Sequence, residues 1–355
     1  MSRWGADVDI DSPDIAHAIA GLVPRLRESG FDERSAARVL GARDVDDLLR
    51  RSALHALGSY GRVAELVRTS EGMLTQLFVR NGDAERHQYT SVLGRDLRII
   101  LETLGMVELG DRVRPTVSVS PHSGMFFLSD PLFSCVGERP VMNLSPDLVM
   151  PPHASSLVMR QEVSGRGGRL LDVGTGSGFL ALTMAPDHES VTGIDVNPRA
   201  VFFAKANALV NGRAGDFRVA GFEDGLDGHD HVVFNAPGRP PRDRAGGLDP
   251  FTAESIVREL GKAPLKAGAL VQVLVIVPVP RGRPDVVAEW LDGRDHTVTE
   301  VDAPMFAIPA AAVAKGRVPA RCLLVDGPDD AGLVMRHLHE KGIDQVVPLL
   351  LSIRG

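Results

Sequence analysis

The fold of this chain is decided by the stretch Arg169-Leu170-Leu171-Asp172-Val173-Gly174-Thr175-Gly176-Ser177-Gly178-Phe179-Leu180-Ala181-Leu182. A short apolar run comes first, three glycines follow at alternate positions, and a stretch rich in helix formers closes it. This order predicts a strand, a tight turn and a helix. The glycines let the turn reverse without Cβ clashes and let backbone N–H groups approach a ligand closely. Because such a turn also serves simply to pack a helix on a sheet, the following segments decide its meaning.

A second short run of β type, Val191–Asp195, ends in a carboxylate about twenty residues after the glycines. In doubly wound nucleotide-binding folds, an acid at that distance accepts hydrogen bonds from a ribose diol. The spacing therefore predicts an adenosine-containing ligand with Asp195 as its ribose acceptor. The alternative role for Asp195 is that of a turn former at the end of a strand.

The glycine spacing separates the candidate ligands. It is Gly-x-Gly-x-Gly, whereas the dinucleotide fingerprint is Gly-x-Gly-x-x-Gly. Residues 171–182 resemble the first motif of class I S-adenosylmethionine-dependent methyltransferases, and residues 193–198 resemble the second. The helix, the adenine-side loop and the catalytic loop of that superfamily are resembled, in order, by residues 199–208, 217–224 and 230–238.

The resemblance implies a Rossmann-like, seven-stranded class I sheet, S-adenosylmethionine as cofactor and a set of cofactor contacts. The glycine turn would approach the cofactor, Asp172 would orient its amino group or the turn, and Phe222 or Glu223 would border adenine. The cofactor residues expected on this basis are Asp172, Gly174, Thr175, Gly176, Gly178, Asp195, Val196, Phe222, Glu223 and Asn235.

The catalytic loop, Asn235-Ala236-Pro237-Gly238, departs from the resembled pattern. Enzymes that methylate planar nitrogens, among them the bacterial glutamine-N5 type, carry Asn or Asp, two prolines and an aromatic residue. There the Asn side chain and a prolyl carbonyl accept hydrogen bonds from the nitrogen, and the aromatic ring stacks on its plane. Asn235 and Pro237 keep the acceptor part, so both are predicted to be catalytic. Ala236 and Gly238 lack the second proline and the stacking ring, which leaves room for another acceptor.

Composition limits the class of protein. The chain has 355 residues, 44% hydrophobic and 24% charged, with a net charge of −7. Such a length predicts two domains, and the acidic balance gives no footprint for a nucleic acid or an anionic membrane. The first residues contain no apolar signal core, so a cytoplasmic protein without a membrane segment is expected. The two cysteines, Cys135 and Cys322, lack metal-ligand spacing, so no metal site is expected.

The N-terminal 130 residues predict a mainly helical, winged-helix-like domain, and residues 131–355 the catalytic domain. Ser12-Pro13-Asp14 is typical of a helix start. The remaining elements predicted in this domain are helices over 34–40, 45–57, 63–77 and 93–104 and strands over 106–115, 117–120 and 125–130. Such a domain could bind DNA, form a homodimer or close over the substrate.

The segment 143–157 links the domains and, by the resemblance, covers the bound cofactor. Its His153 is a candidate general base, with a hydrogen-bonded structural role as the alternative. Residues 239–247 predict a surface loop. The elements predicted after it are helices over 252–260, 284–291 and 331–340 and strands over 269–277, 297–302, 321–325 and 346–353, the last without a defined place in the sheet.

Three functions stay open. The altered catalytic loop and the acidic balance favour methyl transfer to the nitrogen or oxygen of a small molecule, in specialised biosynthesis. The retained Asn235 favours a protein or RNA N-methyltransferase similar to the bacterial glutamine-N5 type. The winged domain favours a DNA-binding regulator that senses S-adenosylmethionine. The acidic charge argues against the nucleic-acid partner in the last two.

Overall fold

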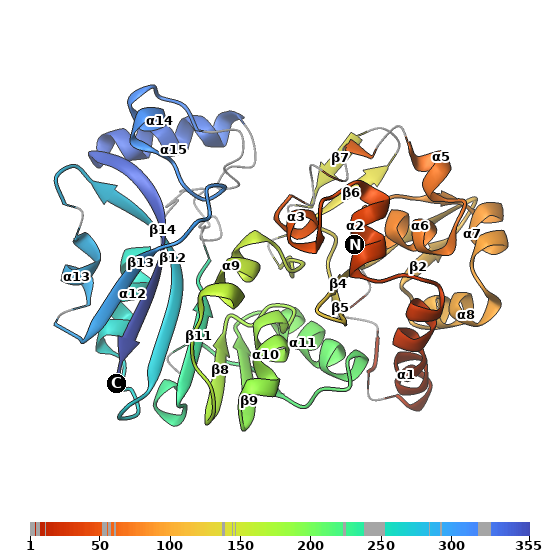
Figure 1. Cartoon of the computed structure of the whole chain (residues 1–355), viewed down its shortest axis with the longest axis horizontal. Coiled ribbons are helices and arrows are strands. Elements are labelled where there is room, and N and C mark those ends of the chain that lie inside the picture. Colours follow the sequence, from red (N-terminus) through yellow and green to blue (C-terminus); the bar gives the residue numbers. More distant parts are fainter. Residues whose placement is uncertain are drawn as a thin grey trace. The chain divides into compact units, whose positions relative to one another are not determined.

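The computed structural model describes residues 4, 8–10, 12–51, 55, 58–59, 62–136, 139–143, 145, 147–222, 225–237, 253–283, 285–291, 293–318 and 328–355 (Figure 1). Packing divides the chain into two compact units. Unit 1 contains residues 1–157, 175–186 and 191–221, and unit 2 contains 158–174, 187–190 and 222–355. This division runs through the methyltransferase-like part of the chain, so the boundary near residue 130 stays a prediction.

The first helices of unit 1 begin at the predicted positions, although the Ser12 side chain makes no capping hydrogen bond to α1. Pro13 occupies the first turn of α1, and Asp32 and Ser35 form a reciprocal capping box at the start of α2, with Ser35 N donating to Asp32 Oδ1 over 2.7 Å. Gly41 ends α2 in the left-handed region at φ 74°. The helices here are α1 (Pro13–Glu28), α2 (Glu33–Leu40) and α3 (Val45–Arg50).

The single helix predicted over 63–77 is wrong, because the chain breaks there into three pieces. These are α5 (Val63–Leu66), α6 (Ser70–Leu74) and the π-helix η2 (Thr75–Val79). The Thr69 hydroxyl caps α6 by accepting from Gly72 N. A Cβ on Gly72 would collide with the Leu66 carbonyl, so this tight return requires glycine. Apolar periodicity runs across the break and conceals it.

A small antiparallel sheet of order β1-β3-β2 follows, as expected of a wing. Arg112 holds it by pairing with Asp83 over 2.6 Å and with Glu85. Its elements and the flanking helices are β1 (Ala84–Glu85), α7 (Arg86–Val92), α8 (Arg95–Thr103), β2 (Val107–Leu109) and β3 (Arg112–Pro115). The N-terminal part is thus mainly helical with a β wing, as predicted.

Two further hairpins complete this part of unit 1. The predicted strands over 117–120 and 125–130 are β4 (Ser118–His122) and β5 (Met125–Ser129), which pair only with each other, and not with the wing, among the described strands. Ser123 and Gly124 form their turn at φ 52° and 72°. The hairpin of β6 (Phe133–Val136) and β7 (Arg139–Met142) was not predicted.

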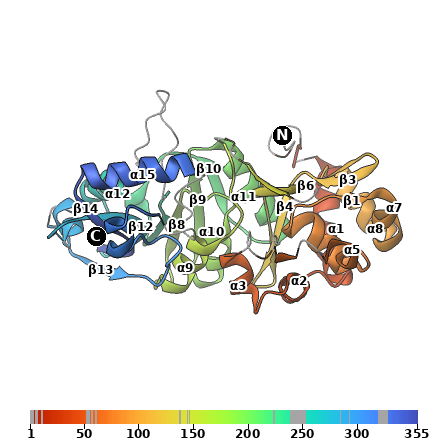
Figure 2. The same ribbon diagram turned by 90° about the horizontal axis from the view of Figure 1, so that it is seen from above.

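The core of unit 1 joins the N-terminal helices to α11 (Pro198–Val210), a helix of the methyltransferase-like part. Ala200, Phe203 and Ala206 of α11 belong to the same buried cluster as Leu22 and Leu26 of α1. The Trp4 ring stacks on Phe203 at 6.2 Å. Helix α11 also contacts α1 and β5 (Figures 1 and 2). The N-terminal region and α11 therefore share one apolar core.

A seven-stranded sheet has the order β10-β9-β8-β11-β12-β14-β13, which is the predicted class I arrangement. Strands β8, β11 and β12 run parallel, as do β9 and β10, whereas β14 is antiparallel to β12 and β13. The strands are β8 (Arg169–Val173), β9 (Ser190–Asp195), β10 (Asp216–Val219), β11 (His231–Asn235), β12 (Leu270–Pro280), β13 (His296–Glu300) and β14 (Ile343–Arg354).

The last strand, whose place the sequence left open, lies between β12 and β13. Both faces of β14 are largely buried because it is an inner strand. Helix α15 packs against it (Figure 2). The strand predicted over 321–325 and the loop 239–247 lie outside the described residues. The remaining helices are α9 (Ala154–Glu162), α10 (Phe179–Met184), α12 (Ala253–Lys262), α13 (Val286–Trp290), α14 (Ala310–Ala314) and α15 (Pro328–Glu340), with 3₁₀ turns η3 (Ala185–Asp187) and η4 (Leu226–Gly228).

No helix in the described part of the chain is long and apolar enough to span a bilayer. The same residues contain no group of three or more His, Cys, Asp or Glu placed to hold a metal ion.

A chain of hydrogen-bonded polar side chains runs through unit 2, in which His231 and Gln272 are buried and His188 and Ser352 are half-buried. His188 Nε2 lies 3.0 Å from His231 Nδ1, and His231 Nε2 lies 3.1 Å from Gln272 Oε1. Gln272 Nε2 in turn donates to the Ser352 hydroxyl. Since the Gln272 oxygen can only accept, His231 carries a hydrogen on Nε2. A neutral His231 then accepts from His188 on Nδ1.

We expect this arrangement to make stability fall in acid. Burial, and then the neighbouring His188, lower the pKa of His231 to about 4, against about 6.5 in an unfolded chain. Between these values the unfolded state binds a proton that the folded state does not, so the free energy of unfolding should drop by about 3 kcal/mol as the pH falls from 6.5 to 4. Urea unfolding at several pH values over this range measures the effect. The free energy of unfolding of His231→Gln should depend less steeply on pH than that of the unaltered protein. The matched control is His87→Gln, at an exposed position of α7, and an equal slope in all three proteins would contradict the assignment.

Candidate active site

The glycine turn after β8 is built as its sequence predicts. Gly174, Gly176 and Gly178 have φ values of 61°, 55° and 79°, all in the left-handed region that favours glycine. Thr175 N donates to Ile194 O of β9 over 2.9 Å, and Gly178 N donates to Thr175 O over 2.8 Å. The turn is thereby fixed to the strand that ends in Asp195.

Asp195 is tied directly to this turn. Its Oδ2 accepts from Gly176 N over 3.0 Å and its Oδ1 accepts from Asn197 N over 2.9 Å. The backbone N–H of Val196 also bonds to this carboxylate. Since the two oxygens offer about four acceptor positions, acceptor capacity remains for ribose hydroxyls. Burial raises the pKa of Asp195, and backbone N–H donors oppose the rise. Two hydroxyl donors would therefore stabilise a carboxylate that is partly removed from water.

Two exposed valines lie next to Asp195 in unit 1. Val196 is 74% exposed and Val219, at the end of β10, is 55% exposed. Ala220 N donates to Asp195 O, which places the end of β10 beside the acid. An aromatic base would bury such side chains, consistent with the predicted adenine side.

In unit 2 the candidate residues lie at the carboxyl ends of β8 and β11. The chain leaves β8 toward one side of the sheet and returns at β11 on the other, so the topological switch point is here. Phe234 pairs with Val173, which brings Asn235 level with Gly174. A Cβ on Gly174 would lie 3.3 Å from the Phe234 ring, so the glycine lets this ring close over the end of β8.

Phe222 also lies at this end of unit 2. Its ring stacks on Phe234, with centroids 6.5 Å apart and planes at 25°. Asp172, in β8, is 1% exposed, and Asn235 is half-buried. Unit 2 therefore gathers Asp172, Gly174, Phe222 and Asn235 near one switch point, and Pro237 follows in the loop. Glu223 and Gly238 lie outside the described residues.

His153 begins helix α9. Its carbonyl accepts from Leu157 N, and its Nδ1 lies 3.3 Å from the Ser155 hydroxyl and 3.4 Å from that of Ser156. Burial lowers the pKa of His153 to about 4, so the imidazole is neutral near pH 7. This geometry is that of the structural alternative, and a general-base role stays a prediction.

Two residues that the sequence did not predict, Asn197 and Arg199, hold the turn after Asp195, and a third, Asn207, holds the glycine turn. Asn197 caps α11 through Arg199 N and donates from Nδ2 to Asp147 O, in the segment expected to cover the cofactor. Arg199 pairs with the buried Asp130 and with Asp147. Asn207, fully buried in α11, contacts Ser177 of the glycine turn. Asn207 could have been found from the sequence, because it is a polar residue inside an otherwise apolar helix.

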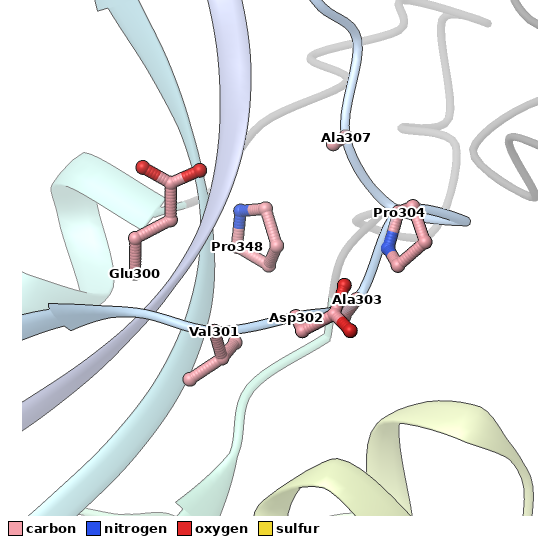
Figure 3. A pocket seen from close by; sticks show the side chains of 7 residues that line it. All are labelled: Glu300, Val301, Asp302, Ala303, Pro304, Ala307 and Pro348. Carbon is pink, nitrogen blue, oxygen red and sulfur yellow. The ribbon is translucent and has the colours of Figure 1, made fainter.

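An open pocket of ≈ 370 Å³ lies in unit 2 at the carboxyl end of β13 (Figure 3). The residues lining it are Glu300, Val301, Asp302, Ala303, Pro304, Ala307 and Pro348. Strand β13 is parallel to β11 and β12, and the pairing places Glu300 beside Leu349, one step beyond the level of Asn235. The pocket is therefore on the same edge of the sheet as Asn235, with two acidic side chains in its wall.

Known proteins match the part of the chain that contains these residues. The family model described as methyltransferase small domain matches residues 153–275. A Methanocaldococcus jannaschii protein that carries the name of a protein N5-glutamine methyltransferase is 28% identical over 148 residues, 38% of this chain and 74% of that protein. The ribosomal RNA small subunit methyltransferase C of Chromohalobacter salexigens is 30% identical over 126 residues, 35% of this chain and 37% of the relative.

A third relative differs in kind. The ubiquinone biosynthesis O-methyltransferase of Xanthomonas axonopodis pv. citri is 41% identical over 78 residues, 21% of this chain and 33% of the relative. The chain thus spans about a third of the length of the RNA and ubiquinone relatives and about three quarters of the archaeal one.

Proposed function

Because the chain is a class I S-adenosylmethionine-dependent methyltransferase similar to the glutamine methyltransferase group, we propose that it methylates a planar nitrogen of a protein acceptor. The observation that carries the proposal is the position of Asn235 at the carboxyl end of β11, level with Gly174 at the switch point. A side-chain amide there can accept a hydrogen bond from the N–H of an amide or amino group. Asn235 would thus select and orient a nitrogen acceptor.

The chemistry asks mainly for such orientation. The sulfonium methyl is already activated, so the acceptor nitrogen forms the new N–C bond while the S–C bond breaks and its electron pair stays on sulfur. The nitrogen then loses one proton to solvent. Alignment alone can lower the barrier by about 7–11 kcal/mol. The carbonyls of Asn235 and Pro237 would hold the N–H groups of the acceptor.

Charge and similarity support a protein over an RNA acceptor. The chain carries a net charge of −7, and Glu300 and Asp302 line the pocket on the same sheet edge, so a polyphosphate would be repelled. The archaeal relative named for protein glutamine methylation has the longest of the three alignments, at 148 residues.

A small-molecule acceptor is the second candidate, and the loop itself favours it. Ala236 and Gly238 stand where the nitrogen methyltransferases carry a proline and a stacking aromatic ring. Without that ring the loop lacks the platform on which a planar group would stack. The ubiquinone O-methyltransferase is similar over 78 residues.

Transfer from tritiated S-adenosylmethionine would separate the two. Purified protein should be incubated with protein, RNA and small-molecule fractions of the cells that produce it, each also after protease or ribonuclease treatment. We expect protease-sensitive label in the protein fraction, released as an N-methylated residue on hydrolysis. Label confined to the small-molecule fraction would replace the proposal with the second candidate, and ribonuclease-sensitive label would contradict both.

A further inference from the structure

Asn207 of α11 and Asn211, the residue that caps the carboxyl end of this helix, satisfy the free edge of strand β5. Asn207 Oδ1 accepts from Leu128 N over 2.7 Å, and its Nδ2 donates to Leu128 O over 2.9 Å. Asn211 makes the same pair of bonds with Phe126, at 2.9 Å to N and 2.8 Å to O. Each side-chain amide therefore replaces one residue of a neighbouring strand.

Asn207 and Asn211 can bond to alternate residues of β5 because the residue spacings of the helix and the strand nearly agree. Positions four apart on a helix are separated by about 6 Å along its axis, and positions two apart on a strand by about 6.7 Å. Asn207 and Asn211 thus reach Leu128 and Phe126 in antiparallel order. The other edge of β5 pairs with β4, so the asparagines supply the only second partner that the described residues provide for this backbone.

Asn207 differs from Asn211 in one contact. Its Nδ2 also donates to Ser177 O of the glycine turn over 2.8 Å, whereas Asn211 Nδ2 donates to Asn207 O of its own helix. Asn207 is 0% exposed, and both amide hydrogens and the carbonyl oxygen are used. One side chain therefore joins the cofactor turn to strand β5.

The β4–β5 hairpin also contacts the residue after the glycine turn through two of its own side chains. Phe179, the first residue of α10 after Gly178, lies 5.0 Å from Phe127 of β5 and 5.2 Å from His122 of β4, measured between ring centroids. The glycine turn region therefore contacts the hairpin directly, through these rings, and indirectly, through the hydrogen bonds of Asn207.

We propose that Asn207 is a positioning residue for the cofactor, which couples S-adenosylmethionine binding to the docking of the β4–β5 hairpin. Asn207 holds Ser177 O, and the neighbouring Gly176 donates its N–H to Asp195, so the contact acts on the part of the turn that meets the acid. By linkage, whatever stabilises the turn stabilises the docked hairpin equally. The inference rests on the cofactor and is independent of the acceptor.

The matched pair of variants Asn207→Ala and Asn211→Ala tests this coupling. Each removes two hydrogen bonds to β5, but only Asn207→Ala releases Ser177. We expect both to lower the Tm, Asn207→Ala to raise the Kd for S-adenosylhomocysteine at least tenfold, and Asn211→Ala to leave that Kd within twofold. Calorimetry at a temperature where both variants are folded supplies the values. Equal changes in Kd, or none, would overturn the proposal.

Hydrogen exchange in the unaltered protein gives a second test that does not depend on a variant folding. Saturating S-adenosylhomocysteine should slow exchange in peptides that cover β5, residues 125–129. Peptides that cover the β2–β3 hairpin, residues 107–115, should not change, because neither strand pairs with the hairpin that Asn207 holds. Unchanged protection of β5 in the presence of the ligand would refute the coupling.

Discussion

Replacing Asn235 by alanine should lower turnover about a hundredfold while the Kd for S-adenosylmethionine stays within threefold. The variant loses the side-chain acceptor at the end of β11, and removal of one such preorganised hydrogen-bonding group slows catalysis by about 10²–10³ in comparable sites. Because alanine fits the half-buried position, the fold should remain. Single-turnover rates with saturating cofactor, beside calorimetric Kd values, measure the two effects separately.

Asn235→Asp is the matched control for that experiment. Aspartate keeps an acceptor oxygen at the same place, so turnover should recover to within about tenfold of the unaltered enzyme if the role of Asn235 is to accept from the acceptor nitrogen. Normal turnover in Asn235→Ala would instead make the loop purely structural. It would also withdraw the main support for a nitrogen acceptor.

Replacing Asp195 by alanine should weaken S-adenosylmethionine binding about a hundredfold or more. The carboxylate is predicted to accept two ribose hydroxyls, and hydrogen bonds to charged groups contribute roughly 1.5–3 kcal/mol each. It also accepts from Gly176 N and Asn197 N, so the variant loosens the turn as well. Both losses act in the same direction on the affinity.

Two further variants separate charge from geometry. Asp195→Asn keeps one acceptor oxygen and should bind the cofactor with intermediate affinity. Asp216→Ala removes the same charge from the first residue of β10, where Asp216 pairs with Thr192 at the opposite end of the strand from Asp195. Its affinity should be unchanged. Unaltered binding in Asp195→Ala would remove Asp195 from the cofactor site.

The N-terminal region packs directly on the helix that follows the predicted ribose-binding residue. Trp4, α1 and β5 pack on α11, the helix that begins just after Asp195 and carries Asn207. The apolar core is continuous across them. In variants of the N-terminal helices, cofactor affinity should therefore be measured as well as acceptor specificity.

The sequence alone determined the class of fold and cofactor. Glycines 174, 176 and 178, the acid at 195 and the loop from 235 are local signals, because a left-handed turn and a strand-end carboxylate depend on residue type and spacing within a few residues. The structure has the predicted sheet and ties Gly176 to Asp195. The start of the helix at Pro13 is predictable for the same reason.

Tertiary structure alone decided what depends on distant partners. The place of β14 between β12 and β13 follows from which position in the sheet buries both of its apolar faces. The breaks at 66–75 follow from the close approach of Gly72 to the Leu66 carbonyl. The pKa of His231 is lowered by burial and by His188, which is remote from it in sequence. Asn207 is likewise an ordinary polar residue in an apolar helix until β5 and Ser177 lie beside it, because a hydrogen-bonding role exists only where the fold brings its donors and acceptors together.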